Sequence, residues 1–226
     1  MHERLIDDST VAAINSASPG ATDALDVARH ANANNLALAR AAAASAEKAA
    51  IDTPDIAILF LLFQFHFRTR SYTDAIRICE SRIAHCRQHH APRHLARALG
   101  NLALVKLTVG DITAAHTVLR EAIALDESEN DPQGLSRDLG TLGQLHEHAH
   151  DWPAARDIYL RALALAEQTA DPAQIATKLA NLGDVYLALH DRANAISCWT
   201  RAIPLLERAG KLTWRDEVLA KFNSLQ

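Results

Sequence analysis

A forty-residue repeat constrains the fold of this chain more than any other feature of its sequence. Asp111, Asp151 and Asp191 stand at equal intervals, and the residues around them recur in the same order. Residues 98–125, 138–165 and 178–205 align without gaps. The matching positions are Leu102, Leu142 and Leu182; Ala115, Ala155 and Ala195; Leu119, Tyr159 and Trp199; and Ala122, Ala162 and Ala202. A period of this length is typical of an array of stacked repeats, so function is expected on a surface that the repeats share.

Each repeat has the pattern of two helices joined by a short turn. Gly110 and Asp111 are the residue types that end one helix and begin the next. Pro153 suits a first helical turn, where the missing N–H of proline would have no partner anyway, and residues 130–132 and 170–172 separate whole repeats. The sequence predicts first helices over residues 93–109, 133–149 and 173–189. One such helix pair cannot bury its apolar face alone, so the pairs must stack.

The repeated positions resemble the tetratricopeptide repeat, which has a Leu and a small residue in its first helix and a small residue, a large apolar residue and an Ala in its second. The small residues after each Leu are Ala103, Gly143 and Gly183. The Asn-Leu-small triplets that begin at Asn101 and Asn181, with the longer period, are more similar to the variant in kinesin light chains, spindle-orientation adaptors and bacterial peptide-sensing regulators. The resemblance implies an all-α fold, a right-handed superhelical solenoid of antiparallel helix hairpins.

The rest of the chain is divided by the same period. The predicted parts are an N-terminal helical segment or eroded repeat (residues 1–50), a degenerate repeat (51–92), three repeats (93–211) and a capping helix (212–226). Ser71 and Asp74 predict a capping box at the second helix of the degenerate repeat. Trp214, Val218 and Phe222 recur at a spacing of four residues, which predicts one apolar helix face.

Composition and charge narrow the class of protein. The chain is 49% hydrophobic and 22% charged, and its richness in Ala and Leu favours a soluble helical array. A formal net charge of -4 supplies no net basic field, so we expect no nucleic-acid partner. The most apolar stretch, residues 56–67, is shorter than the roughly 20 apolar residues of a membrane-spanning helix, so we expect no membrane insertion.

The number of cysteines and the first residues of the chain indicate its cellular compartment. Three cysteines offer no paired framework, which favours a reducing compartment. Residues 1–16 carry acidic side chains and no apolar run of signal-peptide length. We therefore expect a cytoplasmic protein.

The first helices supply the candidate binding surface. Residues three, four and seven apart share a helix face, and the resemblance implies that first helices line the concave side. The predicted peptide-binding stripe comprises Arg97, Asn101, Leu104, Thr108, Arg137, Thr141, Gln144, His148, Thr177, Asn181 and Asp184. An Asn amide offers both a donor and an acceptor to a peptide backbone, and Arg97 and Arg137 suit carboxylates on a ligand. The alternative is a solvated face in which Asn101 bonds within the helix stack.

An apolar face precedes this stripe in the degenerate repeat. Ala57, Phe60, Gln64 and Phe67 continue the same helix face, with Phe63 beside it. Exposed aromatic side chains commonly anchor a partner. We favour burial under the N-terminal segment, or contact with a second copy of the chain through residues 60–67, over an open ligand pocket.

Metal binding and catalysis have little support in the sequence. His85 and His89 are one helical turn apart, as are His146 and His150, but neither pair has a second pair of ligands at a metal-site spacing. The His146-Glu147 dipeptide does not form the His-Glu-x-x-His motif, because His150 comes one residue early. We expect no metal, no cofactor and no enzyme activity.

Two functional interpretations follow. The first is an adaptor or scaffold that binds a segment of another protein in the groove. The alternative is a regulatory sensor that binds a small signalling peptide and controls a separate effector. A sensor needs an output module, and only residues 1–50 are available for one in this chain, which favours the adaptor.

Overall fold

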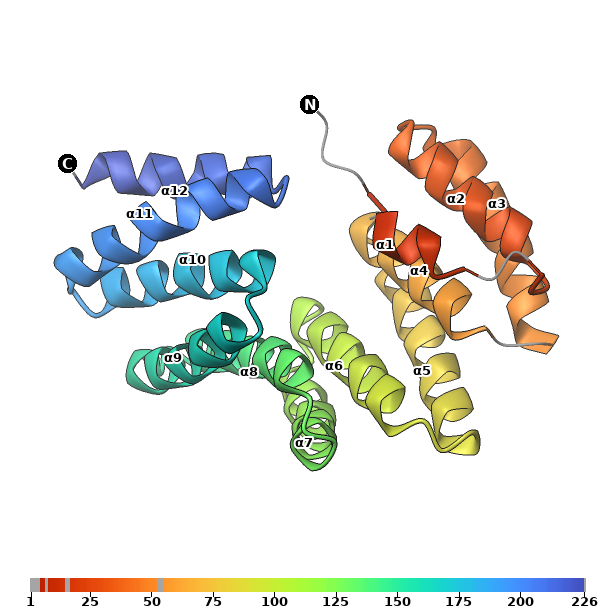
Figure 1. The fold of residues 1–226 in the computed structure, drawn as a ribbon, viewed down its shortest axis with the longest axis horizontal. Helices are drawn as coiled ribbons and strands as arrows, with labels where there is room; N and C mark the ends of the chain where they lie inside the picture. Colours follow the sequence, from red (N-terminus) through yellow and green to blue (C-terminus); the bar gives the residue numbers. More distant parts are fainter. Residues whose placement is uncertain (1–4, 7, 15–16, 53–54, 226) are drawn as a thin grey trace. The chain divides into compact units, whose positions relative to one another are not determined.

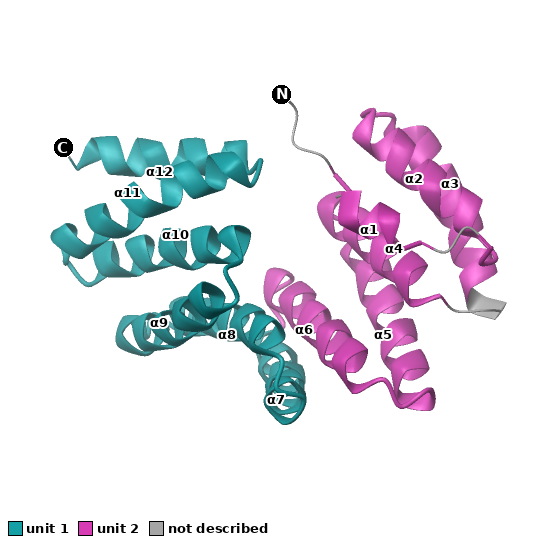
Figure 2. Ribbon diagram, in the orientation of Figure 1, with its two compact units in different colours: residues 1, 112–226 teal, residues 2–111 magenta. Residues whose placement is uncertain are grey.

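The structure is a computed structural model that describes residues 5–6, 8–14, 17–52 and 55–225 (Figure 1). Within those ranges the secondary structure is entirely helical, with helices α1 to α12 and no β-strand. The predicted all-α class is confirmed. The chain divides into two compact units, an N-terminal unit of residues 2–111 and a C-terminal unit of residues 1 and 112–226 (Figure 2).

Helices of the N-terminal unit are α1 (Asp8–Ala12), α2 (Ala21–Asn32), α3 (Leu36–Asp52), α4 (Ile56–Arg68), α5 (Tyr72–Gln88) and α6 (Pro92–Thr108). Those of the C-terminal unit are α7 (Ile112–Ser128), α8 (Pro132–His148), α9 (Trp152–Gln168), α10 (Pro172–Ala188), α11 (Arg192–Arg208) and α12 (Leu212–Ser224). The predicted first helices are confirmed to within one residue, because α6, α8 and α10 begin at a proline one residue before the predicted start.

A turn at every twentieth residue explains the forty-residue period. The backbone takes a positive φ at Arg70, His90, Gly110, Asn130, His150, Ala170, His190 and Gly210. After each of these residues the chain bonds back to the helix it has left: the Asp151 N–H donates to the His146 carbonyl over 2.9 Å, and the Asp191 N–H to that of Tyr186 over 2.8 Å. This bonding closes the C-terminal end of a helix. Two helices with their turns therefore make one repeat.

Aspartates begin several of the helices in the C-terminal unit. The side chains of Asp131, Asp151, Asp171 and Asp191 accept backbone N–H bonds in the first turns of α8, α9, α10 and α11. Such caps satisfy donors that have no partner within the helix. The predicted cap at Ser71 is wrong: α5 begins after Ser71, but the hydroxyl makes no capping bond. It lies 3.5 Å from the Thr69 hydroxyl instead.

Small residues let the helices of the C-terminal unit approach closely. Tyr159 and Trp199 are fully buried. A Cβ atom at Gly143 would lie 2.5 Å from the Tyr159 ring, and one at Gly183 would overlap the Trp199 indole. The indole Nε1 donates a hydrogen bond to the carbonyl of Ala180 over 3.3 Å. Glycine at these two positions is therefore needed for close contact within each hairpin.

The last helix covers the apolar end of the C-terminal unit. Val218 of α12 is fully buried, and Trp214 and Phe222 pack against the core formed by α9, α10 and α11. The three residues lie on one face of α12, as their spacing predicts. The α12 helix therefore shields apolar side chains of α9, α10 and α11 from solvent.

The N-terminal unit has its core around α4. Leu61, Leu62 and Phe65 are fully buried, and α4 contacts α1, α2, α3 and α5. Glu47 of α3 links the three helices by polar contacts: its carboxylate lies 2.5 Å from the His66 ring of α4 and also binds Arg77 of α5. Among the described residues, no helix combines the length and hydropathy needed to cross a bilayer.

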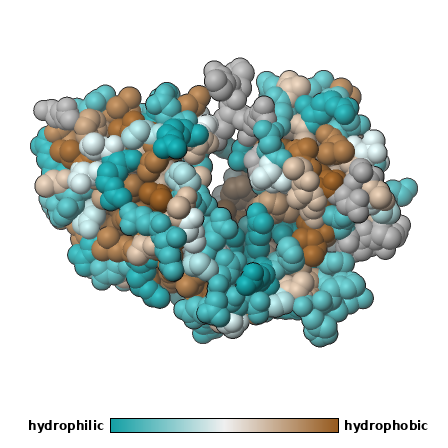
Figure 3. All heavy atoms as spheres, viewed as in Figure 1, coloured by the Kyte–Doolittle hydropathy of each residue, from teal (hydrophilic) through white to brown (hydrophobic). Residues whose placement is uncertain are grey.

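Large apolar side chains are exposed only singly in the described residues. Leu38, Val109, Leu160, Leu187 and Leu219 are exposed, and each belongs to or borders a different helix. On the visible face of each unit, hydrophilic residues surround smaller apolar areas (Figure 3). Because exposed apolar side chains do not cluster on the described surface, polar groups are the better candidates for binding sites.

Candidate functional site

The predicted stripe in the N-terminal unit lies on α6. Arg97 and Thr108 are exposed, Leu104 is half-buried and Asn101 is 8% exposed. The Thr108 hydroxyl donates to the carbonyl of Leu104 over 2.7 Å, within the helix. The Asn101 Nδ2 is buried and makes no hydrogen bond within the part of the chain that is described. Burial of Asn101 agrees with part of the alternative interpretation, but the bond to the helix stack is not present at Nδ2.

Aromatic rings of α4 meet cationic side chains of the same unit. Phe60, Phe63 and Phe67 stack in sequence, with ring centroids 6.2 and 5.7 Å apart. The guanidinium of Arg97 lies 4.1 Å from the Phe60 ring centroid and that of Arg82 lies 5.1 Å from it. Phe63 is 5% exposed, and Phe60 and Phe67 are half-buried. Burial under the N-terminal segment or by a second copy therefore stays a prediction for this face, and Arg97 already has an attractive contact inside the unit.

The predicted stripe in the C-terminal unit lies on α8 and α10. On α8, Arg137 and Gln144 are half-buried, Thr141 is 7% exposed and His148 is exposed. On α10, Thr177, Asn181 and Asp184 are half-buried. The Thr177 hydroxyl donates to the carbonyl of Ala173 and accepts from Lys211 over 3.0 Å. Asn181 and Asp184 differ from Thr177 because each has a polar atom without a hydrogen bond.

A polar cluster surrounds Asn181 and Asp184; it comprises Glu147, Tyr159, Asn181, Asp184 and Lys221, from α8, α9, α10 and α12. Asp184 Oδ2 accepts from Lys221 Nζ over 2.7 Å, and the Tyr159 hydroxyl donates to Glu147. Asn181 Nδ2 and Asp184 Oδ1 are buried atoms that make no hydrogen bond to any described residue. They are three residues apart on one helix face. The cluster thus offers one donor and one acceptor side by side.

Burial shifts the ionisation of this cluster. It raises the pKa of the Glu147 carboxyl, and the nearby Asp184 carboxylate adds to the rise while the Tyr159 hydroxyl opposes it. Burial also raises the pKa of Tyr159, and Glu147 reinforces that shift, whereas the Asn181 amide, which lies near the Tyr159 hydroxyl, opposes it. The phenol therefore stays protonated and keeps donating to Glu147. Because the Tyr159 hydroxyl bonds to Glu147, it does not bond to Asp184, and Asp184 is bound by Lys221.

A second group of charges lies at the other end of α8. Arg137 Nε donates to Asp138 over 3.0 Å, and Arg137 Nη2 lies 4.0 Å from Asp126 of α7. Asp126 and Asp138 are almost fully buried. Burial and the neighbouring Asp138 raise the pKa of Asp126 to about 7, and burial raises that of Asp138 as well. Arg137, predicted to bind a ligand carboxylate, is engaged by carboxylates of its own chain.

Lys178 of α10 is a buried cation beside the stripe. It is 4% exposed, and its Nζ lies where a Cβ atom at Gly140 would stand. Burial lowers the pKa of Lys178, and the positive charges of Lys211 and Arg137 add to the shift, which brings this pKa to about 8. Gly140 is three residues after Arg137 on the predicted face. Because Gly140 has no side chain, the ammonium of Lys178 can lie beside this face.

The histidine pairs do not form metal centres in the described residues. The rings of His85 and His89 lie 4.3 Å apart between centroids, and His146 Nδ1 lies 3.6 Å from Asp151. No described group of three or more His, Cys, Asp or Glu side chains is arranged to hold an ion. Cys79 and Cys86 are free and buried, and burial raises the pKa of Cys79 to about 12, which keeps it a thiol.

Sequence reasoning missed several members of these clusters. Lys221 stands forty residues after Asn181, so the period itself could have placed it on the same face. Glu147 is one residue from His148 of the stripe and was considered only as part of a metal motif. Lys178 and Asp138 occupy equivalent positions in adjacent repeats, but their burial gave no signal because charged residues are rarely buried.

Comparison with known proteins agrees with this architecture. The tetratricopeptide repeat family model matches residues 138–208, which span α8 to α11. No curated protein matches the sequence significantly. Among solved structures, BtubC (BKLC) from P. vanneervenii is 20% identical with a TM-score of 0.65, and the match covers 83% of this chain and 79% of that one.

Two further structures have the same fold. A Rap protein complexed with competence and sporulation factor is 15% identical with a TM-score of 0.73, and the match covers 93% of this chain and 59% of that one. A putative kinesin light chain repeat protein from Podosopora anserina is 12% identical with a TM-score of 0.63, and the match covers 84% and 95%. This chain therefore spans less than two thirds of the Rap protein, and likeness at such identities shows the fold.

Tetratricopeptide repeats are scaffolds for protein–protein interaction, and the family is in general non-enzymatic. The matched residues include the Leu, small-residue and Ala positions that repeat every forty residues. The helix hairpins on either side of them follow the same twenty-residue spacing of turns. Residues 138–208 therefore match the tetratricopeptide repeat family, and the solved structures share the fold of the chain.

Proposed function

We propose that the chain is a protein-interaction adaptor that binds the backbone of a partner's peptide segment on the α8–α10 face of the C-terminal unit. The pair of unsatisfied atoms on α10, Asn181 Nδ2 and Asp184 Oδ1, carries the proposal. A side-chain N–H and a carboxylate oxygen one turn apart match the C=O and N–H of an extended peptide. Such recognition depends little on the ligand's own side chains.

Energetics favour a ligand at this place. A buried polar atom without a hydrogen bond costs about 1–3 kcal/mol. A peptide that supplies one acceptor and one donor would remove both costs. The Lys221 ammonium holds Asp184 through Oδ2, while Oδ1 is buried and makes no hydrogen bond to a described residue. Asn101 supports the same reading in the N-terminal unit, because its Nδ2 is also buried without a hydrogen bond.

Binding measurements on folded variants test the proposal. A partner would be captured from the native cell with the whole chain, identified by mass spectrometry and reduced to the shortest segment that binds. In calorimetry we expect Asn181→Ala to weaken binding roughly fivefold and Asp184→Ala more than tenfold, from about 1 kcal/mol for a neutral bond and 1.5–3 for a charged one.

The matched control lies on a second helix. Arg161 is exposed on α9, and Arg161→Ala should leave the affinity unchanged. If Arg161→Ala abolishes binding while Asn181→Ala and Asp184→Ala retain it, the α8–α10 face is not the binding surface.

Scattering separates the adaptor from the sensor. A rigid adaptor keeps its radius of gyration when the captured segment binds, whereas a sensor that closes around a signalling peptide becomes more compact. Compaction on binding would contradict the adaptor and favour the sensor.

A further inference from the structure

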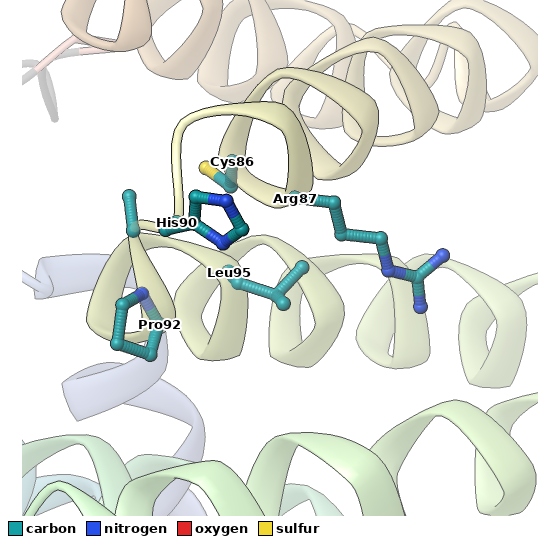
Figure 4. Close-up of a pocket in the computed structure, with 6 residues that line it drawn as sticks. Cys86, Arg87, His90, Pro92 and Leu95 are labelled. Atoms are coloured by element: carbon teal, nitrogen blue, oxygen red, sulfur yellow. The ribbon is translucent and has the colours of Figure 1, made fainter.

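Basic side chains border gaps in the packing of both units. In the N-terminal unit, a pocket of about 380 Å³ lies where α5 ends and α6 begins (Figure 4). Its basic residues, Arg87 and His90, are exposed, so water can hydrate them. In the C-terminal unit, the gap at Gly140 adjoins Lys178, which is buried. A buried cation gains more from a bound anion than a hydrated one does.

Lys178 occupies a core position of the repeat. The residues at forty-residue intervals from it are Ala98, Asp138 and Val218, and all three are fully buried. At such a position an aliphatic side chain, as at Ala98 and Val218, avoids the cost of burying a charge. We therefore looked for a contact that an ammonium can make and an apolar side chain cannot.

The Lys178 ammonium has no partner of its own in the described residues. It makes no hydrogen bond and no ion pair with any of them. Lys178 is 4% exposed, and its Nζ, unlike Nδ2 of Asn181, is not closed to solvent. The stem is thus buried while the charged tip lies beside Gly140 at the α8 face.

Other positive charges stand near this tip. Burial lowers the pKa of Lys178 most, and Lys211 and Arg137 add to the shift. The carboxylates of Asp138 and Asp171 oppose it, but the pKa still falls to about 8. Like charges that repel one another are stabilised by an anion placed between them.

The two nearby carboxylates are held by other groups. Asp138 accepts a hydrogen bond from Arg137 Nε over 3.0 Å. Asp171 accepts one from the Gln133 side chain over 3.0 Å and caps the first turn of α10 through backbone N–H groups. Neither forms an ion pair with Lys178. An anion from outside the chain can therefore supply the missing counter-charge.

We propose that the Lys178 site, formed by Lys178, Arg137 and Lys211, binds a phosphate monoester group. A phosphate carries up to two negative charges and three terminal oxygens that accept hydrogen bonds. These match donors that come from α10, from α8 and from the start of α12. A carboxylate has one charge and two oxygens, so it would meet fewer of the donors. The Lys178 site lies one turn from Asn181, but phosphate binding does not depend on the proposed backbone recognition.

The test uses the whole chain, labelled with nitrogen-15, and three probes at constant ionic strength. Inorganic phosphate is the free anion, N-acetylphosphoserine methylamide presents a phosphate on a residue, and N-acetylglutamic acid methylamide presents a carboxylate. In NMR titrations, the Gly140 amide signal should shift saturably with at least one phosphate probe, and that probe should bind more tightly than the glutamate. Tighter binding of inorganic phosphate indicates a small phosphate ligand, and tighter binding of the phosphoserine probe indicates a phosphorylated partner.

Variants locate the site. Lys178→Met should weaken phosphate binding about tenfold or more, the loss expected for a hydrogen bond between charged groups. It should stay folded, because it replaces a buried charge with an apolar side chain. The matched control is Arg161→Met, which also removes one positive charge, at an exposed position of α9; it should keep the affinity of the unmodified chain. Far-ultraviolet circular dichroism checks that each variant is folded.

Four results would overturn the proposal. They are the absence of a saturable shift at Gly140 with either phosphate probe; equal affinity for the glutamate and phosphoserine probes, which would show a carboxylate site; equal losses in Arg161→Met and Lys178→Met, which would show nonspecific charge attraction; and full affinity of the folded Lys178→Met variant. Each of these leaves the peptide proposal standing, because Asn181 and Asp184 are tested with the captured segment.

Discussion

Substitution of Gly183 by alanine tests the close contact between α10 and α11. The added Cβ atom would overlap the indole of Trp199, which is fully buried and cannot move without disturbing the core. Overpacking of this kind costs about 1–3 kcal/mol, and displacement of the indole also threatens its bond to the Ala180 carbonyl, worth about 1 kcal/mol. Better helix propensity returns about 1 kcal/mol. The net loss is therefore about 1–3 kcal/mol.

Thermal unfolding followed by circular dichroism measures this loss. For a chain of this length, 1 kcal/mol corresponds to about 2–4 °C, so Tm should fall by roughly 2–12 °C. Exposed Ser197 of α11 gives the control, because Ser197→Ala also alters a helical residue but touches no core contact. A Gly183→Ala variant that melts with or above the parent chain would refute the close contact.

A double-mutant cycle attributes the loss to the indole. The first repeat carries Ala103 and Leu119 at the positions of Gly183 and Trp199, so Trp199→Leu removes the ring from the place where the Cβ atom would stand. In that background, Gly183→Ala should cost nothing or stabilise the chain. Equal costs in both backgrounds would show that the two residues are not coupled.

Three more predictions concern the core of the C-terminal unit. Because burial and Asp138 raise the pKa of Asp126 to about 7, the folded chain holds this proton more tightly than the unfolded chain, and the associated stability is lost as pH rises from about 4 through 7. The stability of Asp126→Asn relative to the parent should therefore increase between pH 5 and pH 8.5 in urea unfolding. A difference that does not change with pH would contradict the raised pKa. Burial lowers the pKa of Lys178 to about 8, with Lys211 adding to the effect, so Lys178→Met should stabilise the chain by about 1–4 kcal/mol at pH 7. This gain should shrink as pH rises from about 8 to 10.5. Equal stability of variant and parent at pH 7 would show that Lys178 is not a destabilising buried charge. Ala155 is fully buried in α9, so Ala155→Leu should cost about 1–3 kcal/mol in the same assay, and parent-like unfolding would show that the repeat register is wrong.

The fold could be predicted because local signals agree with the period. Each first helix in the aligned region begins at a proline, and several helices of the C-terminal unit follow an aspartate that caps them. The turns were harder to predict in detail, because Ala170 and the histidines take a positive φ that glycine usually takes. There the spacing between helices, rather than residue type, determines the conformation.

The candidate site could be predicted only in part. Helical spacing placed Asn181 and Asp184 on one face, but it did not reveal that Lys221 binds one oxygen of Asp184 and leaves the other without a hydrogen bond. Lys221 lies in α12, outside the aligned repeats, so the forty-residue spacing between Asn181 and Lys221 was not used to predict a contact. Spacing assigns a face to a residue, whereas hydrogen bonding depends on side chains from other helices.

Differences between repeats determine where this array can act. The positions that recur, such as Ala155 and Ala195, are buried and serve packing. At Asp126, by contrast, the repeat replaces an apolar or thiol side chain with a carboxylate, and Gly134 provides the space for it. A buried charge lowers stability unless it is paired, so its presence at one position of one repeat requires a compensating contact. Arg137 supplies part of that contact from 4.0 Å away, and the hydrogen bond between the Asp126 and Asp138 carboxyl groups supplies the remainder.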